Sequence, residues 1–339
     1  MIAEEDLVRS PAWLPVEVTA GGVTVVRLDE ADYRRASFLD QRLLTLGYER
    51  SLCSRETIGS AASRLVSPSH YIFHTGHVGS TLLSRLLGEH AAFFVLREPA
   101  LLRAIAAAEA AATTGPRVDD VGGALSLEVS LAFLGRTWRP GQRSVVKATS
   151  FVSELAGRAL ASATHPTAIF MFAQPLAYLQ CIFAGPASRA ETLKLAPLRL
   201  GRLVRRIGGP DPHNHPRSEG EWIAMSWACE MSALREAAGR FAARVSWVDF
   251  DAFLAEPAGA LEKILRTLGE RPAAPEIERL LGSPVMRQYS KAPEHAYDAA
   301  LRRVLLLEAG REHAAEISRG MQWLERLTRQ HPVLETQPR

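Results

Sequence analysis

The sequence predicts an α/β protein in which a mostly parallel sheet is flanked by helices, with an N-terminal appendage and a helical C-terminal part. Between residues 67 and about 255, short apolar runs alternate with helical segments or turns. These runs are rich in β-branched and aromatic residues, as is typical of strands buried on both faces of a sheet. From about residue 257 the pattern is mostly helical. We therefore divide the chain into an appendage (1–66) and a main domain (67–330).

The composition is that of an ordinary globular protein, with 339 residues, 47% hydrophobic and 23% charged residues. The net charge of +3 is too small to indicate nucleic acid as a partner. The three cysteines (Cys53, Cys181 and Cys229) form no CxxC pair, which favours a reducing compartment over a zinc site or a disulfide framework. No apolar run approaches the roughly 20 residues of a membrane span, and the acidic N-terminus lacks a signal core. We expect a cytoplasmic protein.

The expected elements follow in chain order. In the appendage, "GGVTVVRL" predicts a strand and "ASFLDQRLLTL" a helix. In the main domain, "FVSELAGRAL" predicts a helix that Thr149 and Ser150 can cap. The segments 257–269 and 298–327 predict the C-terminal helices, after a polar loop at 208–220. The predicted strands of the sheet are 71–74, 92–96, 144–148, 167–173 and 244–250.

The most informative stretch is "HTGHVGST" (74–81), which joins a predicted strand to a leucine-rich helix. Gly76 and Gly79 allow the backbone to approach an anion, and the amides near Gly79, Ser80 and Thr81 would face it, helped by the helix dipole. The loop is not a Walker A motif, because His74 stands at the first glycine position and Ser80 at the lysine position. Without that lysine and an evident magnesium aspartate, an ATP-dependent kinase is disfavoured. A glycine turn that binds no ligand remains the alternative.

"HVGST" resembles the 5′-phosphosulfate loop of sulfotransferases, enzymes that use 3′-phosphoadenosine 5′-phosphosulfate (PAPS). Further resemblances come in the family's order: "FFVLREP" (93–99), "VVKATS" (145–150), "WVDFDAFLAEPAGALEKILRTLGE" (247–270) and "YSKAPEH" (289–295). They are similar to the strands and the late loop of the bacterial and protein-tyrosine enzymes. The resemblance implies a P-loop-type, sulfotransferase-like domain with 3′,5′-ADP as the product and no required metal.

The same resemblance implies roles for individual residues. It makes Glu98 the catalytic base. Lys147, at the end of a strand near a phosphate site, would stabilise charge on the transferring group, and His77, which stands where the family usually has Lys or Arg, could donate to the leaving phosphate oxygen if protonated. Taken alone, Glu98 is also compatible with a helix-start carboxylate, Lys147 with a solvated strand end, and His77 with an ordinary loop histidine. Arg97 can bind an anion or pair with Glu98. The predicted nucleotide-binding residues are Gly76, His77, Val78, Gly79, Ser80, Thr81, Arg189, Ser290 and Lys291.

The sequence departs from the family where the 3′-phosphate normally binds. Ala173 and Cys181 stand at the positions of the usual arginine and serine, and neither side chain can hold a phosphate dianion. We therefore expect replacement cations elsewhere, with Arg189 and the Ser290–Lys291 pair as the first candidates. The arginines at helical spacing are usually a solvated face, although one of them could supply this contact: Arg199, Arg202, Arg205 and Arg206.

The predicted function is sulfuryl transfer from PAPS to a hydroxyl or amine acceptor. The sequence leaves the acceptor open among small molecules, glycans, lipids and peptides, and leaves the oligomeric state open. The alternative is a non-catalytic or repurposed P-loop protein that binds a nucleotide or a phosphorylated ligand. The substitutions at Ala173 and Cys181 favour this alternative, whereas the retained Glu98 and Lys147 oppose it.

Overall fold

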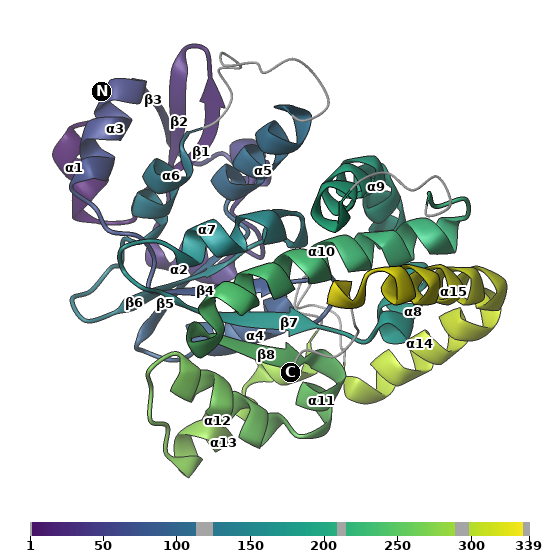
Figure 1. Ribbon diagram of the computed structural model, residues 1–339. Helices are drawn as coiled ribbons and strands as arrows, with labels where there is room; N and C mark the ends of the chain where they lie inside the picture. Colours follow the sequence, from purple (N-terminus) through teal and green to yellow (C-terminus); the bar gives the residue numbers. More distant parts are fainter. Residues whose placement is uncertain (1, 113–124, 209–214, 289–297, 335–339) are drawn as a thin grey trace.

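A computed structural model describes residues 2–112, 125–208, 215–288 and 298–334. At its centre lies a five-stranded sheet in the order β5-β6-β4-β7-β8, and every neighbouring pair is parallel. This arrangement confirms the predicted fold class, and all five predicted strands are present (Figure 1). Their bounds are β4 (His70–His74), β5 (Phe93–Arg97), β6 (Arg143–Lys147), β7 (Thr167–Phe172) and β8 (Val245–Asp249).

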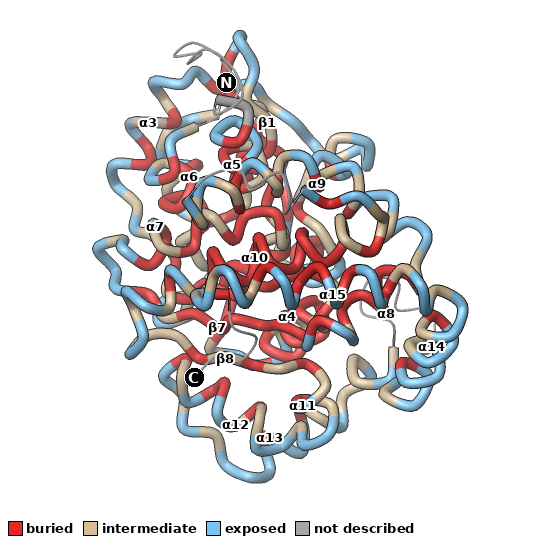
Figure 2. Tube along the Cα trace, turned by 45° about the vertical axis from the view of Figure 1, so that its right-hand side comes forward, coloured by how far each residue is buried: buried red, intermediate tan, exposed pale blue. Residues whose placement is uncertain are grey.

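Both faces of the sheet are buried, which explains the continuous apolar runs of its strands. Along β4, Tyr71 and Phe73 pack into one core, and Ile72 packs into a second core on the opposite face. Successive side chains of a strand point to opposite faces, so one run serves both cores. Figure 2 shows the strands as a buried layer beneath helices that expose their outer faces.

The helices form two layers and a C-terminal group. Helices α5, α6, α7 and α10 contribute to the core with Tyr71, and α4, α11, α12 and α13 to the core with Ile72. A third core joins α8, α9, α10, α14 and α15. The helix bounds are α4 (Ser80–Gly88), α5 (Ala100–Ala112), α6 (Leu127–Leu134), α7 (Ala156–Leu160), α8 (Pro175–Ala184), α9 (Pro186–Ile207), α10 (Glu219–Phe241), α11 (Phe250–Ala255), α12 (Pro257–Thr267), α13 (Ala274–Leu281), α14 (Ala299–Glu312) and α15 (Ala314–Gln330).

The N-terminal residues form a separate antiparallel sheet of β1 (Trp13–Thr19), β2 (Gly22–Arg27) and β3 (Arg50–Cys53), with α1 (Glu4–Arg9), α2 (Glu30–Arg35) and α3 (Arg55–Ser63). The predicted strand is β2. This unit is joined to the main sheet by buried arginines. Arg136 donates hydrogen bonds to the carbonyls of Leu7, Ser10 and Trp13. The domain boundary at residue 66 stays a prediction.

One predicted helix is wrong in type, and a second is right only in its second half. Within 36–46 only a 3₁₀ turn forms, η1 (Gln41–Thr45), because Asp40 accepts hydrogen bonds from the backbone and side chain of Arg42. The segment 151–160 is the 3₁₀ helix η2 (Ser150–Leu155) followed by α7. Thr149 provides no side-chain cap for η2. The predicted helical segment 298–327 is confirmed, and it consists of two helices, α14 and α15, which are separated at His313.

Candidate active site

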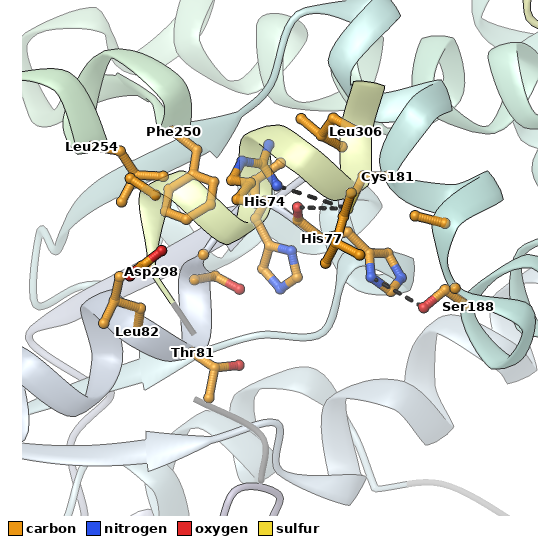
Figure 3. Close-up of a pocket in the computed structure, with 18 of the residues that line it drawn as sticks. His74, His77, Thr81, Leu82, Cys181, Ser188, Phe250, Leu254, Asp298 and Leu306 are labelled. Atoms are coloured by element: carbon orange, nitrogen blue, oxygen red, sulfur yellow. Dashed lines mark hydrogen bonds between the residues drawn. The ribbon is translucent and has the colours of Figure 1, made fainter. Parts of the chain in front are cut away.

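A cavity of about 330 Å³ lies at the carboxyl edge of the sheet, where ligands bind in open α/β folds (Figure 3). Residues of the loop after β4 line it, as do residues at the ends of β5 and β6. Further lining residues come from α8, α9, α11 and α14. The fold therefore gathers segments far apart in the sequence around the predicted phosphate loop.

His74 holds the loop to the sheet. This residue ends β4, and its Nδ1 accepts a hydrogen bond of 3.1 Å from the backbone N–H of Gly76. Its Nε2 lies 2.9 Å from the carbonyl oxygen of Ala148, which can only accept, so Nε2 carries the proton. A neutral imidazole thus links the first turn of the loop to the end of β6. This contact explains why a histidine occupies the position of the first Walker A glycine.

The loop needs glycine at Gly79. Its φ is +67°, and an added Cβ would lie 2.0 Å from Cε2 of Phe250, so any side chain would overlap the ring. Gly76 also has a left-handed φ, of +103°. His77 adopts φ 54° without being glycine, and Val78 anchors the loop by being completely buried. A strained residue of this kind persists where the surrounding structure holds it, and such residues gather at functional sites.

The start of α4 is suited to an anion. Helix α4 begins at Ser80, and its N-cap residue, Gly79, supplies no side-chain hydrogen bond to the first turn. The first backbone N–H groups of a helix have no partner within it, and the helix dipole is positive there. Ser80 and Thr81 are nearly buried and line the cavity. The loop can therefore hold a phosphate through backbone amides, without a lysine.

Glu98 and Lys147 form an ion pair beside this loop. Lys147 ends β6 and its side chain is 1% exposed, so it is not a solvated strand end. Its Nζ contacts Oε1 of Glu98, whose side chain is 13% exposed. The backbone of Glu98 is left-handed, with φ 51°, and its N–H donates to the Lys147 carbonyl at 2.7 Å. Both residues line the cavity, so a carboxylate and an ammonium face it together.

Arg97 takes neither of the roles expected for it. Its guanidinium donates to three main-chain carbonyls of residues 33–36, at 2.7–2.9 Å. Burial, with a contribution from Arg85, lowers the pKa of Arg97 to about 9. The side chain joins the N-terminal unit to the sheet and points away from Glu98.

The structure separates the remaining predicted residues. The His77 ring lies in the cavity lining, with Nδ1 3.4 Å from Oγ of Ser188 on α9 (Figure 3). Arg189 forms a two-point ion pair with Glu219 of α10 and lies outside that lining. Its expected contact with the nucleotide therefore finds no support in this geometry. Ser290 and Lys291 lie outside the described residues.

The two departures from the family pattern have different surroundings. Ala173 is buried, and its carbonyl accepts a hydrogen bond of 3.0 Å from Nε1 of Trp227. Cys181 lines the cavity, and its Sγ lies 3.8 Å from the carbonyl oxygen of His77 and 3.8 Å from Nη1 of Arg302. We missed Arg302 in the sequence because it stands in an ordinary leucine-rich helix, 121 residues after Cys181.

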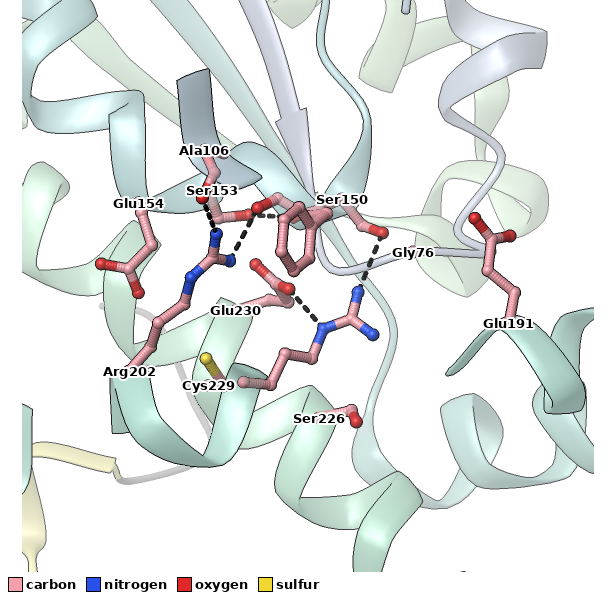
Figure 4. Close-up of polar contacts among 12 residues, drawn as sticks. Gly76, Ala106, Ser150, Ser153, Glu154, Glu191, Arg202, Ser226, Cys229 and Glu230 are labelled. Carbon is pink, nitrogen blue, oxygen red and sulfur yellow. Dashed lines mark hydrogen bonds and ion pairs between the residues drawn. The ribbon is translucent and has the colours of Figure 1, made fainter. Parts of the chain in front are cut away.

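The expected solvated arginine face is wrong for Arg199 and Arg202. Arg199 is buried and its Nε lies 2.6 Å from Oε1 of buried Glu230, a contact drawn as a dashed line from Glu230 in Figure 4. Burial alone would lower the pKa of Arg199, but the charge of Glu230, its hydrogen bond, Tyr178 and Cys229 together outweigh burial and raise the pKa. Arg202 donates to main-chain carbonyls of η2 and α5. A second contact of Arg199 reaches Oγ of Ser150, which adjoins Gly76. Arg199 therefore reaches the loop through Ser150, whereas Arg202 joins η2 to α5.

Across the described residues, no group of three or more histidine, cysteine or acidic side chains is arranged to hold a metal ion. In the same part of the chain, none of the helices has the length and apolarity needed to cross a bilayer. Cys53, Cys181 and Cys229 form no disulfide with one another.

The comparisons with known proteins concern the fold. A scan of protein-family models finds none that matches, and a search of curated proteins finds no significant match. Among solved structures, the chain is similar to a sulfotransferase domain from the curacin biosynthetic pathway, with 14% identity and a TM-score of 0.41 over 77% of this chain and 98% of that one. It is also similar to a sulfotransferase from Alicyclobacillus acidocaldarius, with 15% identity and a TM-score of 0.37 over 70% of this chain and 98% of that one. At such low similarity, any function must be argued from the residues of the cavity.

Proposed function

We propose that the protein transfers a sulfuryl group from PAPS to an acceptor hydroxyl or amine. The observation that carries this proposal is the Glu98–Lys147 pair, which lines the same cavity as the glycine-containing loop at 76–81, the expected anion site. Glu98 also has a left-handed backbone, which favours a functional role over a simple helix-start carboxylate.

The residues of the cavity can divide the reaction among themselves. The amides of 79–81 would hold the 5′-phosphate, and Glu98 would take the proton of the acceptor. The acceptor oxygen or nitrogen then forms its bond to sulfur as the bond between sulfur and the 5′-phosphate oxygen breaks, which releases 3′,5′-ADP. Lys147 and His77 would stabilise the charge that develops on the transferring and leaving groups. In this proposal these groups stabilise the developing charge without a metal. We expect the protein to act in the cytoplasm.

Thermal denaturation with nucleotides tests the cofactor. At about 100 times its dissociation constant, a ligand adds roughly 2.7 kcal/mol to the free energy of unfolding. We expect 3′,5′-ADP to raise the melting temperature more than ATP with magnesium at equal concentration. Equal or stronger stabilisation by ATP with magnesium would contradict the proposal, because the loop would then serve a kinase.

The second candidate is a non-catalytic protein that binds a nucleotide or phosphorylated ligand, which the residues at Ala173 and Cys181 favour. Turnover of PAPS distinguishes this second candidate from the sulfotransferase. Release of 3′,5′-ADP from PAPS, measured with a panel of phenols, sugars, lipid alcohols, peptides and amines, is expected for the enzyme only. Binding of 3′,5′-ADP without turnover across that panel would favour the second candidate.

A further inference from the structure

Arg302 is a buried cation in the wall of the cavity. It stands on α14 and is 3% exposed, whereas its neighbours Leu301 and Arg303 face solvent. Asp251 accepts hydrogen bonds from Nε at 2.9 Å and from Nη2 at 3.4 Å. The third nitrogen, Nη1, lies on the side of Cys181, 3.8 Å from the sulfur. One edge of the guanidinium is therefore held by a carboxylate, which fixes the direction of the other edge.

Two contacts connect Arg302 with the phosphate loop. Its guanidinium lies over the ring of Phe250, 4.8 Å from the centroid, and this is the ring against which Gly79 packs. Cys181, which meets Nη1, also contacts the carbonyl of His77 (Figure 3). Arg302 therefore shares a neighbour with each side of the loop and lies at its margin.

The surroundings of Arg302 differ from those of the buried arginines that serve the fold. Arg97 and Arg136 each donate to three or more main-chain carbonyls, and neither belongs to the cavity lining. Arg302 belongs to that lining, and its carboxylate partner, Asp251, has a side chain that is 43% exposed. Arg302 thus places a cation in the wall of the cavity, beside Cys181 and the ring of Phe250, where an anionic group of a ligand can add a charge-assisted hydrogen bond.

We propose that Arg302 binds the phosphate on the ribose 3′ position of the nucleotide. It would replace, from helix α14, the two side chains that Ala173 and Cys181 cannot supply. This inference rests on the proposed function, because it assumes a nucleotide whose 5′-phosphate lies in the loop. It also changes our expectation for the replacement cation from Arg189, which is held by Glu219, to Arg302.

Calorimetry with two nucleotides tests this role. The unmodified protein is titrated with 3′,5′-ADP, 5′-AMP and inorganic phosphate, and so are the Arg302→Gln and Arg303→Ala variants. We expect Arg302→Gln to weaken 3′,5′-ADP roughly tenfold or more and to leave 5′-AMP within about twofold. Arg303→Ala, which removes an exposed arginine from the same helix, should change neither affinity. Inorganic phosphate should bind weakly in every case, because it lacks the nucleoside.

The results that would overturn the inference are distinct from failure of the proposed function. Equal weakening of both nucleotides by Arg302→Gln would mean that Arg302 only shapes the cavity. Equal affinities of the unmodified protein for the two nucleotides would mean that no residue reads the 3′-phosphate. Preference for ATP with magnesium over both nucleotides would instead refute the proposed function. Circular dichroism checks that each variant is folded.

If the Arg302→Gln variant does not fold, the Arg302→Lys variant tests whether Arg302 binds the 3′-phosphate. Lysine keeps the charge beside Asp251 but lacks the planar fork of donors. We expect the affinity ratio of 3′,5′-ADP to 5′-AMP to fall severalfold in this variant. A ratio within twofold of that of the unmodified protein would overturn the inference.

Discussion

Substitution of Glu98 by glutamine separates the chemical role of this residue from its structural role. Glutamine keeps the shape of the side chain and an oxygen that can accept from Lys147, but it removes both the charge and the basic site. Because the Lys147 side chain is only 1% exposed, the variant is expected to lose stability as well as turnover. The two losses are separable because unfolding measures the first and turnover of the folded enzyme measures the second.

The stability loss follows from the change in one buried ion pair. Glutamine keeps a hydrogen bond to Lys147 but leaves the buried ammonium without its opposite charge, and removal of one partner of a buried ion pair costs about 3–5 kcal/mol. Because the hydrogen bond is retained, we expect a loss at the lower end of this range, about 3 kcal/mol, in the free energy of unfolding. Loss of a general base lowers turnover by about 10² to 10⁴, which corresponds to roughly 2.7–5.4 kcal/mol in the barrier. Affinity for 3′,5′-ADP should barely change.

The assays are urea unfolding, calorimetry with 3′,5′-ADP, and release of 3′,5′-ADP from PAPS with the best acceptor found. The matched control is Glu109→Gln, which removes a carboxylate from an exposed pair with Arg158 and should change stability by less than about 0.5 kcal/mol. Near-normal turnover of Glu98→Gln would refute its assignment as the base. A stability loss no larger than that of the control would refute the view that the ion pair stabilises the fold.

Three further predictions test the pH dependence, the loop and the attachment of the N-terminal unit. Burial lowers the pKa of His70 to about 4 from 6.5, so between these values the unfolded chain binds a proton that the folded chain does not. The free energy of unfolding should therefore fall as the pH falls from 6.5 to 4, by on the order of 3 kcal/mol, and urea unfolding of His70→Gln should lack this part of the slope. Gly79→Ala should lower the melting temperature and abolish the shift caused by 3′,5′-ADP, because the new methyl group overlaps Phe250. The control is Gly141→Ala, because Gly141 has a similar φ of +78° but no atom within 4 Å of an added Cβ, so this variant should keep the shift caused by 3′,5′-ADP. An equal fall in melting temperature in both variants would contradict the role of the Phe250 overlap and would show that the positive φ alone is responsible. Arg97→Met should cost about 3 kcal/mol in urea unfolding, since it leaves main-chain carbonyls without donors, and a loss of 3′,5′-ADP affinity beyond twofold would contradict its structural role.

The sequence alone determined the strands of the main sheet and the glycine positions of the loop after β4. Both signals are local, because a strand buried on two faces is a continuous apolar run and a loop that approaches an anion needs glycine at fixed positions. Local pattern failed at 36–46, where a short 3₁₀ turn replaces the expected helix, and in the first half of 151–160, where a 3₁₀ helix precedes α7.

Only the tertiary structure decided which polar groups meet. Glu98 and Lys147 are 49 residues apart, Arg199 and Glu230 are 31 apart, and Cys181 and Arg302 are 121 apart. Such contacts depend on which strands are neighbours and how helices cross, and no short-range period of the sequence records these relations. The same reason explains why Arg189 was a plausible phosphate ligand in the sequence although Glu219 holds it. Residue type and spacing specify what a segment can do, whereas packing between distant segments decides what it contacts.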